Sequence, residues 1–312
     1  MKRFPALLCA AAALVTGAAL TATPAHAQPM LPVNFDFATG ALAGALFPGS
    51  PPPGANNGCQ PSAAHPYPVI LVNGTFANQD DNWQAASPLL ANHGYCVFTF
   101  NYGGSGIITS TGDIAVSAQE LAAFVAQVRA ETGAAKVDLV GHSQGGMMPR
   151  YYLKFLGGAQ YVHTLVGIAP SNHGTTLDGL ATLARTLGLI GLVNSAINPL
   201  CTACVEQEAG SGFLTSLNAG GDTVPGVSYT VIESRDDEVV TPYTSAFLSG
   251  PGVTNITVQN QCWLDQSDHL EIAADPVALA DTLNALDPAH PVRVPCLLIL
   301  PVTGPVGPVP SF

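Results

Sequence analysis

The sequence predicts an α/β protein in which a mostly parallel sheet is covered by helices on both faces. Short β-branched apolar runs, the form of buried parallel strands, alternate with helical segments along the chain. A glycine-flanked serine also stands where one such strand turns into a helix. The 312 residues, 47% of them hydrophobic, are enough for one large domain with a sizeable core.

Hydrophobic patterns place the expected strands and helices along the chain. The strands are Val69–Asn73, Tyr95–Asn101, Lys136–Val140, His163–Ala169 and Tyr229–Glu233. The helices are Trp83–His93, Ser117–Thr132, Met147–Leu156 and Pro276–Leu286. In the second helix Ser117 and Glu120 form a capping box, and an apolar stripe follows at helical spacing. Pro149 lacks a backbone N–H, so we expect it to kink the third helix.

The two ends of the chain differ in character from its middle. Residues 1–27 resemble a signal peptide, with Lys2 and Arg3 before an apolar stretch and Ala25-His26-Ala27 as the cleavage site. A membrane anchor is the alternative, but the apolar stretch is short for a span. We therefore expect secretion after cleavage near Ala27 and no stable membrane anchor. Residues 28–66 lack periodicity and are expected to be irregular, the catalytic domain spans 67–290, and the proline-rich tail 291–312 is expected to be flexible or loosely docked.

Six cysteines remain after the predicted cleavage, an even number that fits disulfides in an exported protein. More than one connectivity is open to six cysteines. Proximity in sequence favours three pairs: Cys59–Cys96, Cys201–Cys204 and Cys262–Cys296. The Cys201-x-x-Cys204 spacing also fits a redox pair or half a zinc site, but no second such pair or nearby histidine completes a metal site.

Charge and composition bear on the partners of the protein. The formal net charge of −12 argues against binding to nucleic acid, which needs Lys and Arg for phosphate contacts. The charge leaves neutral, apolar substrates open, and we expect a monomer. Residues 177–198 are strongly apolar and interrupt the strand–helix alternation. They form either a buried core helix or a mobile helical lid over the active site.

The sequence Gly141-His142-Ser143-Gln144-Gly145 matches the pattern G-x-S-x-G, with a strand before it and a helix after it. A serine on such a tight turn points outward at the carboxyl end of the sheet. The turn also places the Gln144 amide at a helix N-terminus, where it can bind an oxyanion. Ser143 is therefore the candidate nucleophile, and it needs a histidine base held by a carboxylate.

On this type of turn the acid and then the histidine follow the serine along the chain. The histidines after Ser143 are His163, His173, His269 and His290. We favour His269, because it lies in a loop before the last predicted helix.

The candidate acids follow the strand that ends at Glu233. They are Asp236, Asp237 and Glu238, and position alone does not separate the two aspartates. Asp222 precedes the strand and is less suitable. The second oxyanion donor is expected in the loop after the first strand, where the Thr75 amide, with or without its hydroxyl, is the candidate.

Together these segments resemble the class 2 lipase family of bacterial α/β-hydrolases over most of residues 60–287. The resemblance is closest in ETGAAKVDLVGHSQGGMMPRYYLKFL, and it extends to Val69–Phe76, to Ser234-Arg235-Asp236-Asp237-Glu238-Val239-Val240 and to the Asp268-His269 loop. It implies that Asp237 is the acid, and it supports Ser143, His269, Thr75 and Gln144. Many members carry His-Gly where this chain has Asn73-Gly74. The Gly-Thr and Ser-Gln pairs also resemble fungal lipase B enzymes, which use the same two oxyanion positions.

The resemblance implies an α/β-hydrolase fold with a short helical cap or lid, and a secreted lipase or esterase that acts on lipid or other esters. It implies an acyl-enzyme on Ser143 and neither metal nor organic cofactor. An acyltransferase or a hydrolase of polyesters or phospholipids on the same fold is the alternative. A catalytically silent secreted binding protein is a remote one.

Overall fold

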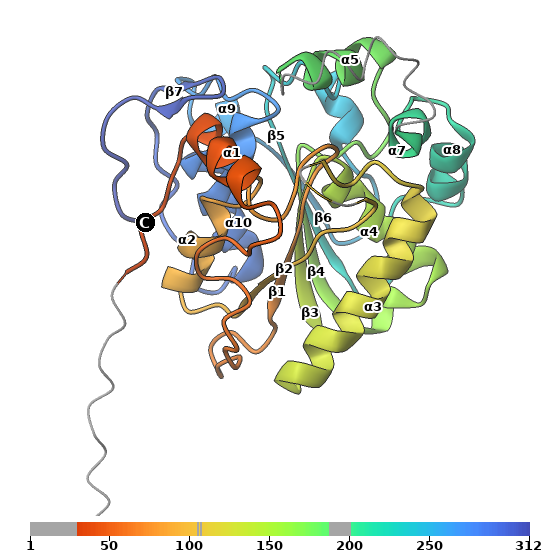
Figure 1. The fold of residues 1–312 in the computed structure, drawn as a ribbon, viewed down its shortest axis with the longest axis horizontal. Coiled ribbons are helices and arrows are strands. Elements are labelled where there is room, and N and C mark those ends of the chain that lie inside the picture. The colour runs from red at the N-terminus through yellow and green to blue at the C-terminus, as the bar shows by residue number, and fades with distance from the viewer. Residues whose placement is uncertain (1–29, 105, 107, 187–200) are drawn as a thin grey trace, which may run out of the picture. The chain divides into compact units, whose positions relative to one another are not determined.

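Six parallel strands form the central sheet, in the order β2-β1-β3-β4-β5-β6 (Figure 1). They are β1 Val69–Val72, β2 Val97–Thr99, β3 Val137–His142, β4 Val162–Ile168, β5 Ser228–Glu233 and β6 Val253–Thr257. Every residue of β1, β2 and β3 is buried, as expected for strands covered on both faces. The predicted α/β class is confirmed.

The computed structural model describes residues 30–104, 106, 108–186 and 201–312. Residues 31–312 form one compact unit. The predicted signal peptide 1–27 and residues 187–198 of the predicted lid lie outside the described residues. No helix in the part of the chain that is described is both long and apolar enough to cross a membrane.

The five predicted strands all form, with ends shifted by a few residues. The sixth strand, β6, was not predicted. It lies at the edge of the sheet beside β5, and most of its residues are partly or fully exposed. Its sequence VTNIT therefore lacks the continuous apolar run by which buried strands are recognised.

Four helices pack on the two faces of the sheet. Helices α2 (Ala86–Asn92) and α10 (Pro276–Leu286) lie on one side, and α3 (Ile114–Thr132) and α4 (Gln144–Phe155) lie on the other (Figure 1). Each overlaps a predicted helix, and α10 has the predicted bounds. Helix α4 includes Pro149 and ends at Phe155, and the kink expected at Pro149 stays a prediction.

The predicted capping box of α3 is wrong. The helix begins at Ile114, and the Asp113 carboxylate caps it by accepting a hydrogen bond from the Val116 N–H at 2.9 Å. The Ser117 hydroxyl instead donates to the Asp113 carbonyl, and Glu120 accepts from the Gly103 N–H. The apolar stripe predicts the buried face, whereas an aspartate one turn earlier supplies the cap.

The connection between β4 and β5 carries the short helices at the carboxyl end of the sheet. Helices α5 (Leu177–Thr186), α7 (Thr202–Glu206) and α8 (Gly212–Asn218) lie beyond the strand ends (Figure 1). Other short elements are α9 (Val258–Gln261) and the 3-10 helices Gly158–Gln160, Tyr243–Ala246 and Glu271–Ala273.

The expectation that residues 28–66 are irregular is wrong for Phe37–Leu46, which form helix α1. Its sequence, FATGALAGAL, contains two glycines and no polar face, so it shows no amphipathic pattern. Tertiary packing stabilises it instead. The Phe37 N–H donates to the Glu271 carboxyl at 3.1 Å. A side chain at Gly44 would overlap Asp81, so the glycine permits the close approach.

The C-terminal tail is held more firmly than expected. Strands β7 (Ile299–Leu300) and β8 (Gly304–Pro305) form an antiparallel hairpin, and Ile299 is fully buried. The Val302 carbonyl accepts a hydrogen bond from the Ala38 N–H at 3.1 Å, so the tail contacts the N-terminal helix.

All three predicted disulfides are present: Cys59–Cys96, Cys201–Cys204 and Cys262–Cys296. The last one ties the start of the tail to the end of α9. Proximity in sequence predicted the pairing correctly.

Candidate active site

Ser143 occupies the tight turn between β3 and α4 that the sequence predicts. Its φ angle of 55° is unusual for a residue with a side chain and is imposed by the turn. A side chain at Gly141 would overlap the Gly145 carbonyl, and one at Gly145 would overlap the Val72 carbonyl. Only glycine therefore allows the helix to start so close to the sheet.

The fold brings Ser143, Asp237 and His269 together. His269 Nε2 lies 2.9 Å from Ser143 Oγ, and His269 Nδ1 lies 2.7 Å from Asp237 Oδ2. The second oxygen of Asp237 accepts hydrogen bonds from the Val239 and Val240 N–H groups, both at 2.7 Å. These bonds hold the carboxylate so that one oxygen faces the imidazole.

The other candidate acids do not contact the His269 ring. Asp236 is exposed, and Glu238 accepts a hydrogen bond from the His269 main-chain N–H at 3.3 Å. Asp222 lies within reach of Arg150 and His173 instead.

The other candidate bases have different partners. His163 contacts Asp138 at 2.9 Å, and His290 contacts Asp287 at 3.0 Å. His173 contacts Asp222 at 3.2 Å. Of the four histidines after Ser143, His269 alone lies within hydrogen-bond distance of its hydroxyl in the described structure.

Charges in this cluster shift the ionisation of each group. Burial opposes ionisation of Asp237, but the His269 ring and two backbone N–H groups outweigh it and lower the pKa of Asp237. Burial also opposes charging of His269, yet the Asp237 carboxylate raises the pKa of His269 above its usual 6.5. Glu233, at the end of β5, is fully buried beside Asp237. Burial and the Asp237 charge raise the pKa of Glu233 well above its usual value, which favours its neutral form.

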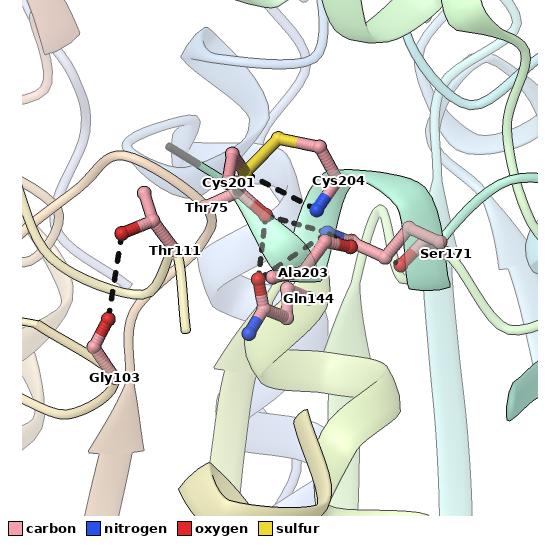
Figure 2. Close-up of a disulfide and its surroundings, with 9 residues drawn as sticks. Thr75, Gly103, Thr111, Gln144, Ser171, Cys201, Ala203 and Cys204 are labelled. Atoms are coloured by element: carbon pink, nitrogen blue, oxygen red, sulfur yellow. Dashed lines mark hydrogen bonds between the residues drawn. A yellow bond between two sulfur atoms is a disulfide. The ribbon is translucent and has the colours of Figure 1, made fainter. Parts of the chain in front are cut away.

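The loop after β1 packs directly against Ser143. A Cβ atom at Gly74 would lie 3.1 Å from Ser143 Cβ. No described residue accepts a hydrogen bond from the main-chain N–H of Thr75 or of Gln144. The Thr75 hydroxyl donates to the Gln144 side-chain carbonyl at 2.7 Å (Figure 2), so its proton is already used. Two unused main-chain donors therefore flank the candidate nucleophile.

His142 links this loop to the His269 loop, a role that the sequence did not suggest. His142 Nε2 lies 2.8 Å from the His269 carbonyl, which only accepts, so Nε2 carries the proton. Nδ1 then accepts from the Asn82 side-chain amide at 3.2 Å, and the Asn82 carbonyl accepts from the Gly74 N–H at 2.7 Å. Burial lowers the pKa of His142 to about 3, so the link is uncharged.

Asn73, the residue after β1, has other hydrogen-bond partners. Its side-chain amide donates to the Ala77 carbonyl at 2.7 Å and to the Ser110 hydroxyl at 2.8 Å. It thus fixes the loop to residues 109–110.

A narrow pocket of about 30 Å³ opens beside Ser143. Apolar side chains from four separate segments line it: Phe37 and Ala41 of α1, Phe76 and Ala77 of the β1 loop, Leu183 of α5, and Leu270 beside His269. The contribution of α1 was missed because residues 28–66 were expected to be irregular.

Within residues 30–104, 106, 108–186 and 201–312, no three His, Cys, Asp or Glu side chains are placed to hold a metal ion.

The six-stranded parallel sheet with a serine on the strand–turn–helix after β3 defines the α/β-hydrolase fold. Residues 66–280 match the family described as Lipase (class 2), and the chain belongs to this family.

Single proteins match this chain either over a short stretch or at low sequence identity. A triacylglycerol lipase of Pseudarthrobacter phenanthrenivorans is 45% identical over 94 residues, which is 28% of this chain and 28% of that lipase. A triacylglycerol lipase of Pseudomonas fragi is 24% identical over 233 residues, 72% of each chain. Among solved structures, Aspergillus fumigatus lipase B has a TM-score of 0.60 at 22% identity, covering 78% of this chain and 56% of the fungal one. This last likeness supports the fold.

Proposed function

We propose that this chain is a secreted carboxylic-ester hydrolase, a triacylglycerol lipase or esterase with Ser143, Asp237 and His269 as its catalytic triad. The observation that carries the proposal is the continuous contact from Asp237 through His269 to Ser143, with distances of 2.7 and 2.9 Å. Family membership and the names of the matched relatives favour lipid esters as substrates.

Acylation begins when Ser143 Oγ attacks the ester carbonyl carbon and His269 Nε2 takes the serine proton. Asp237 keeps Nδ1 protonated and stabilises the imidazolium that forms. The Thr75 and Gln144 main-chain N–H groups donate to the oxyanion of the tetrahedral intermediate. They are suited to this because no described group uses them.

Collapse of this intermediate breaks the bond to the leaving alcohol, which receives the proton from His269. Water then repeats the sequence on the acyl-enzyme, with His269 as base, and releases the acid and free Ser143. None of these steps requires a metal or an organic cofactor.

The apolar pocket lining supports an acyl chain as the group bound beside Ser143. Its present volume of about 30 Å³ is far below the roughly 300–1,000 Å³ of pockets that enclose a small-molecule ligand. We propose that α5, the described part of the predicted lid, moves to admit substrate. Leu183→Trp, which adds bulk to the pocket wall, should lower hydrolysis of C16 esters more than that of C2 esters. An unchanged ratio would argue against a role for α5 in acyl-chain binding.

The disulfides, the predicted signal peptide and the net charge bear on where the protein acts and what it binds. Three disulfides fit an oxidising compartment, and the predicted signal peptide would direct the protein there. The net charge of −12 disfavours nucleic acid and anionic membranes as partners. We expect a monomer with no stable membrane anchor.

The test is hydrolysis of p-nitrophenyl esters from C2 to C16 by the mature protein, Ser143→Ala and Ser216→Ala. Ser216 is exposed on α8, so its variant controls for the loss of a serine hydroxyl. Activity up to long chains in the parent and Ser216→Ala, but not in Ser143→Ala, would establish a lipase with this nucleophile. Short-chain activity alone would make it an esterase. A product that appears only with an added alcohol acceptor would indicate an acyltransferase instead.

A further inference from the structure

The short helix α7 is a disulfide-closed turn beside the candidate oxyanion residues (Figure 2). A helix of five residues is not stable alone. The Cys201–Cys204 disulfide spans its first turn, and Cys201 Sγ accepts a hydrogen bond from the Cys204 N–H at 3.1 Å. The Ala203 N–H donates to the Thr111 carbonyl at 3.1 Å, which ties the turn to the loop before α3.

Gln207, directly after α7, connects this turn to the oxyanion residues. Its side chain is buried, with 1% of the residue exposed. Its carbonyl accepts from the Ser171 hydroxyl at 2.8 Å, and its Nε2 donates to the Ala203 carbonyl at 3.1 Å. Nε2 also donates to Thr75 Oγ1 at 2.9 Å and lies 3.3 Å from Gln144 Oε1.

A backbone carbonyl fixes the orientation of the Gln207 amide. The Ala203 carbonyl only accepts, so Gln207 must present its NH₂ to it. The same NH₂ then donates to the Thr75 hydroxyl, whose own proton goes to Gln144 Oε1. Thr75 and Gln144 are thereby joined through their side chains, and each leaves its main-chain N–H unused.

The three joined side chains come from separate parts of the chain. Thr75 follows β1, Gln144 starts α4, and Gln207 lies in the insertion between β4 and β5. Oxyanion stabilisation depends on donors that are already oriented before the reaction. A buried amide that clamps both residues at once supplies that orientation.

We propose that Gln207, held by the Cys201–Cys204 turn, is a positioning residue that orients the Thr75 and Gln144 amides toward the oxyanion. This inference rests on the proposed function. Gln207 acts through these two residues and needs no contact with the ester.

The test compares Gln207→Ala and Gln207→Glu with the parent in the mature protein. We would measure kcat and KM for p-nitrophenyl butyrate, and Ki for an alkyl trifluoromethyl ketone, which forms an oxyanion when serine adds to it. Loss of one oxyanion donor costs about 10²–10³ in kcat, so misplacing donors should cost about 10- to 100-fold. KM should change little, and Ki should rise in proportion to the fall in kcat/KM.

Gln207→Glu separates orientation from packing. The ionised carboxylate would face the Ala203 carbonyl and the Thr75 hydroxyl without a proton to donate. At acidic pH the protonated carboxyl regains one donor, so the activity relative to the parent at the same pH should recover. Val125→Ala, which shortens a buried side chain on α3, controls for a general loss of stability.

The disulfide enters the same test. Cys201→Ser combined with Cys204→Ser should lower kcat in the same direction as Gln207→Ala. Adding Gln207→Ala to that pair should then cost much less than it does alone, because both changes release the same amide.

Retention of kcat within about threefold in Gln207→Ala, with Ser143→Ala inactive, would overturn the inference and leave the proposed function standing. Changes of kcat and Ki in Val125→Ala as large as those in Gln207→Ala would overturn it too, since a loss of stability alone would then explain the effect. An inactive parent would refute the proposed function and this inference with it.

Discussion

Replacing Asp237 by asparagine should invert the tautomer of His269. One oxygen of Asp237 accepts from the Val239 and Val240 N–H groups, both at 2.7 Å, and must remain an acceptor. The asparagine NH₂ would therefore face His269 Nδ1, which then has to accept. The ring proton would move to Nε2, where it faces Ser143 Oγ, and the imidazole could no longer take the serine proton.

The expected loss is large because the substitution removes the base as well as a charge. An equivalent change in a Ser-His-Asp site lowers kcat about 10⁴-fold. Each tenfold step corresponds to about 1.4 kcal/mol, so a fall of 10³ to 10⁴ is about 4–5.5 kcal/mol of activation free energy. Folding should be little affected, because asparagine preserves the shape of the side chain.

The assay is kcat for p-nitrophenyl butyrate at pH 8, with circular dichroism to verify the fold. Asp236→Asn is the matched control, since it neutralises the exposed neighbour that does not contact His269. It should retain kcat within about threefold, as surface changes usually do. A decrease in kcat of less than tenfold in Asp237→Asn would refute the assignment of Asp237. An equally large decrease in Asp236→Asn would refute it as well.

Three further predictions concern pH and stability. Because Asp237 favours the charged form of His269, kcat/KM should fall at acidic pH with an apparent pKa above the ordinary histidine value of 6.5. An apparent pKa below 6.5 would contradict this. Burial raises the pKa of Glu271 from 4.5 to about 9, so between these pH values the carboxyl ionises in the unfolded chain but not in the folded one, and stability falls as pH rises. Glu271→Gln should therefore raise Tm at pH 8 but not at pH 4, and equal shifts would refute it. The Cys262–Cys296 disulfide closes a loop with a sequence separation of 34. Replacing both cysteines by serine should therefore lower the free energy of unfolding, measured in urea, by about 3–4 kcal/mol. A decrease under about 1 kcal/mol would contradict this.

Local sequence patterns were sufficient to predict the strands and helices that hold the candidate site. The buried strands and the helices that cover them are recognisable because each has its own pattern of apolar residues within a short stretch of sequence. Ser143 was predicted from five residues, because the glycines report a turn that no larger side chain permits. The three disulfides were also predictable, since each joins cysteines that are near in sequence.

Choices among neighbouring residues needed more than the local pattern. Asp236 and Asp237 are equivalent by position, and the family resemblance was needed to prefer Asp237. In the structure the loop exposes Asp236 and turns Asp237 toward His269.

Contacts between distant segments were decided by the tertiary structure alone. Helix α1 has no amphipathic pattern, yet Phe37 lines the pocket because Glu271 accepts its N–H across a separation of 234 residues. Gln207 lies 132 residues from Thr75, and nothing in its own neighbourhood marks it. Sequence patterns report how a residue is buried in its own element. Which groups from other elements then become its hydrogen-bond partners depends on how the whole chain packs.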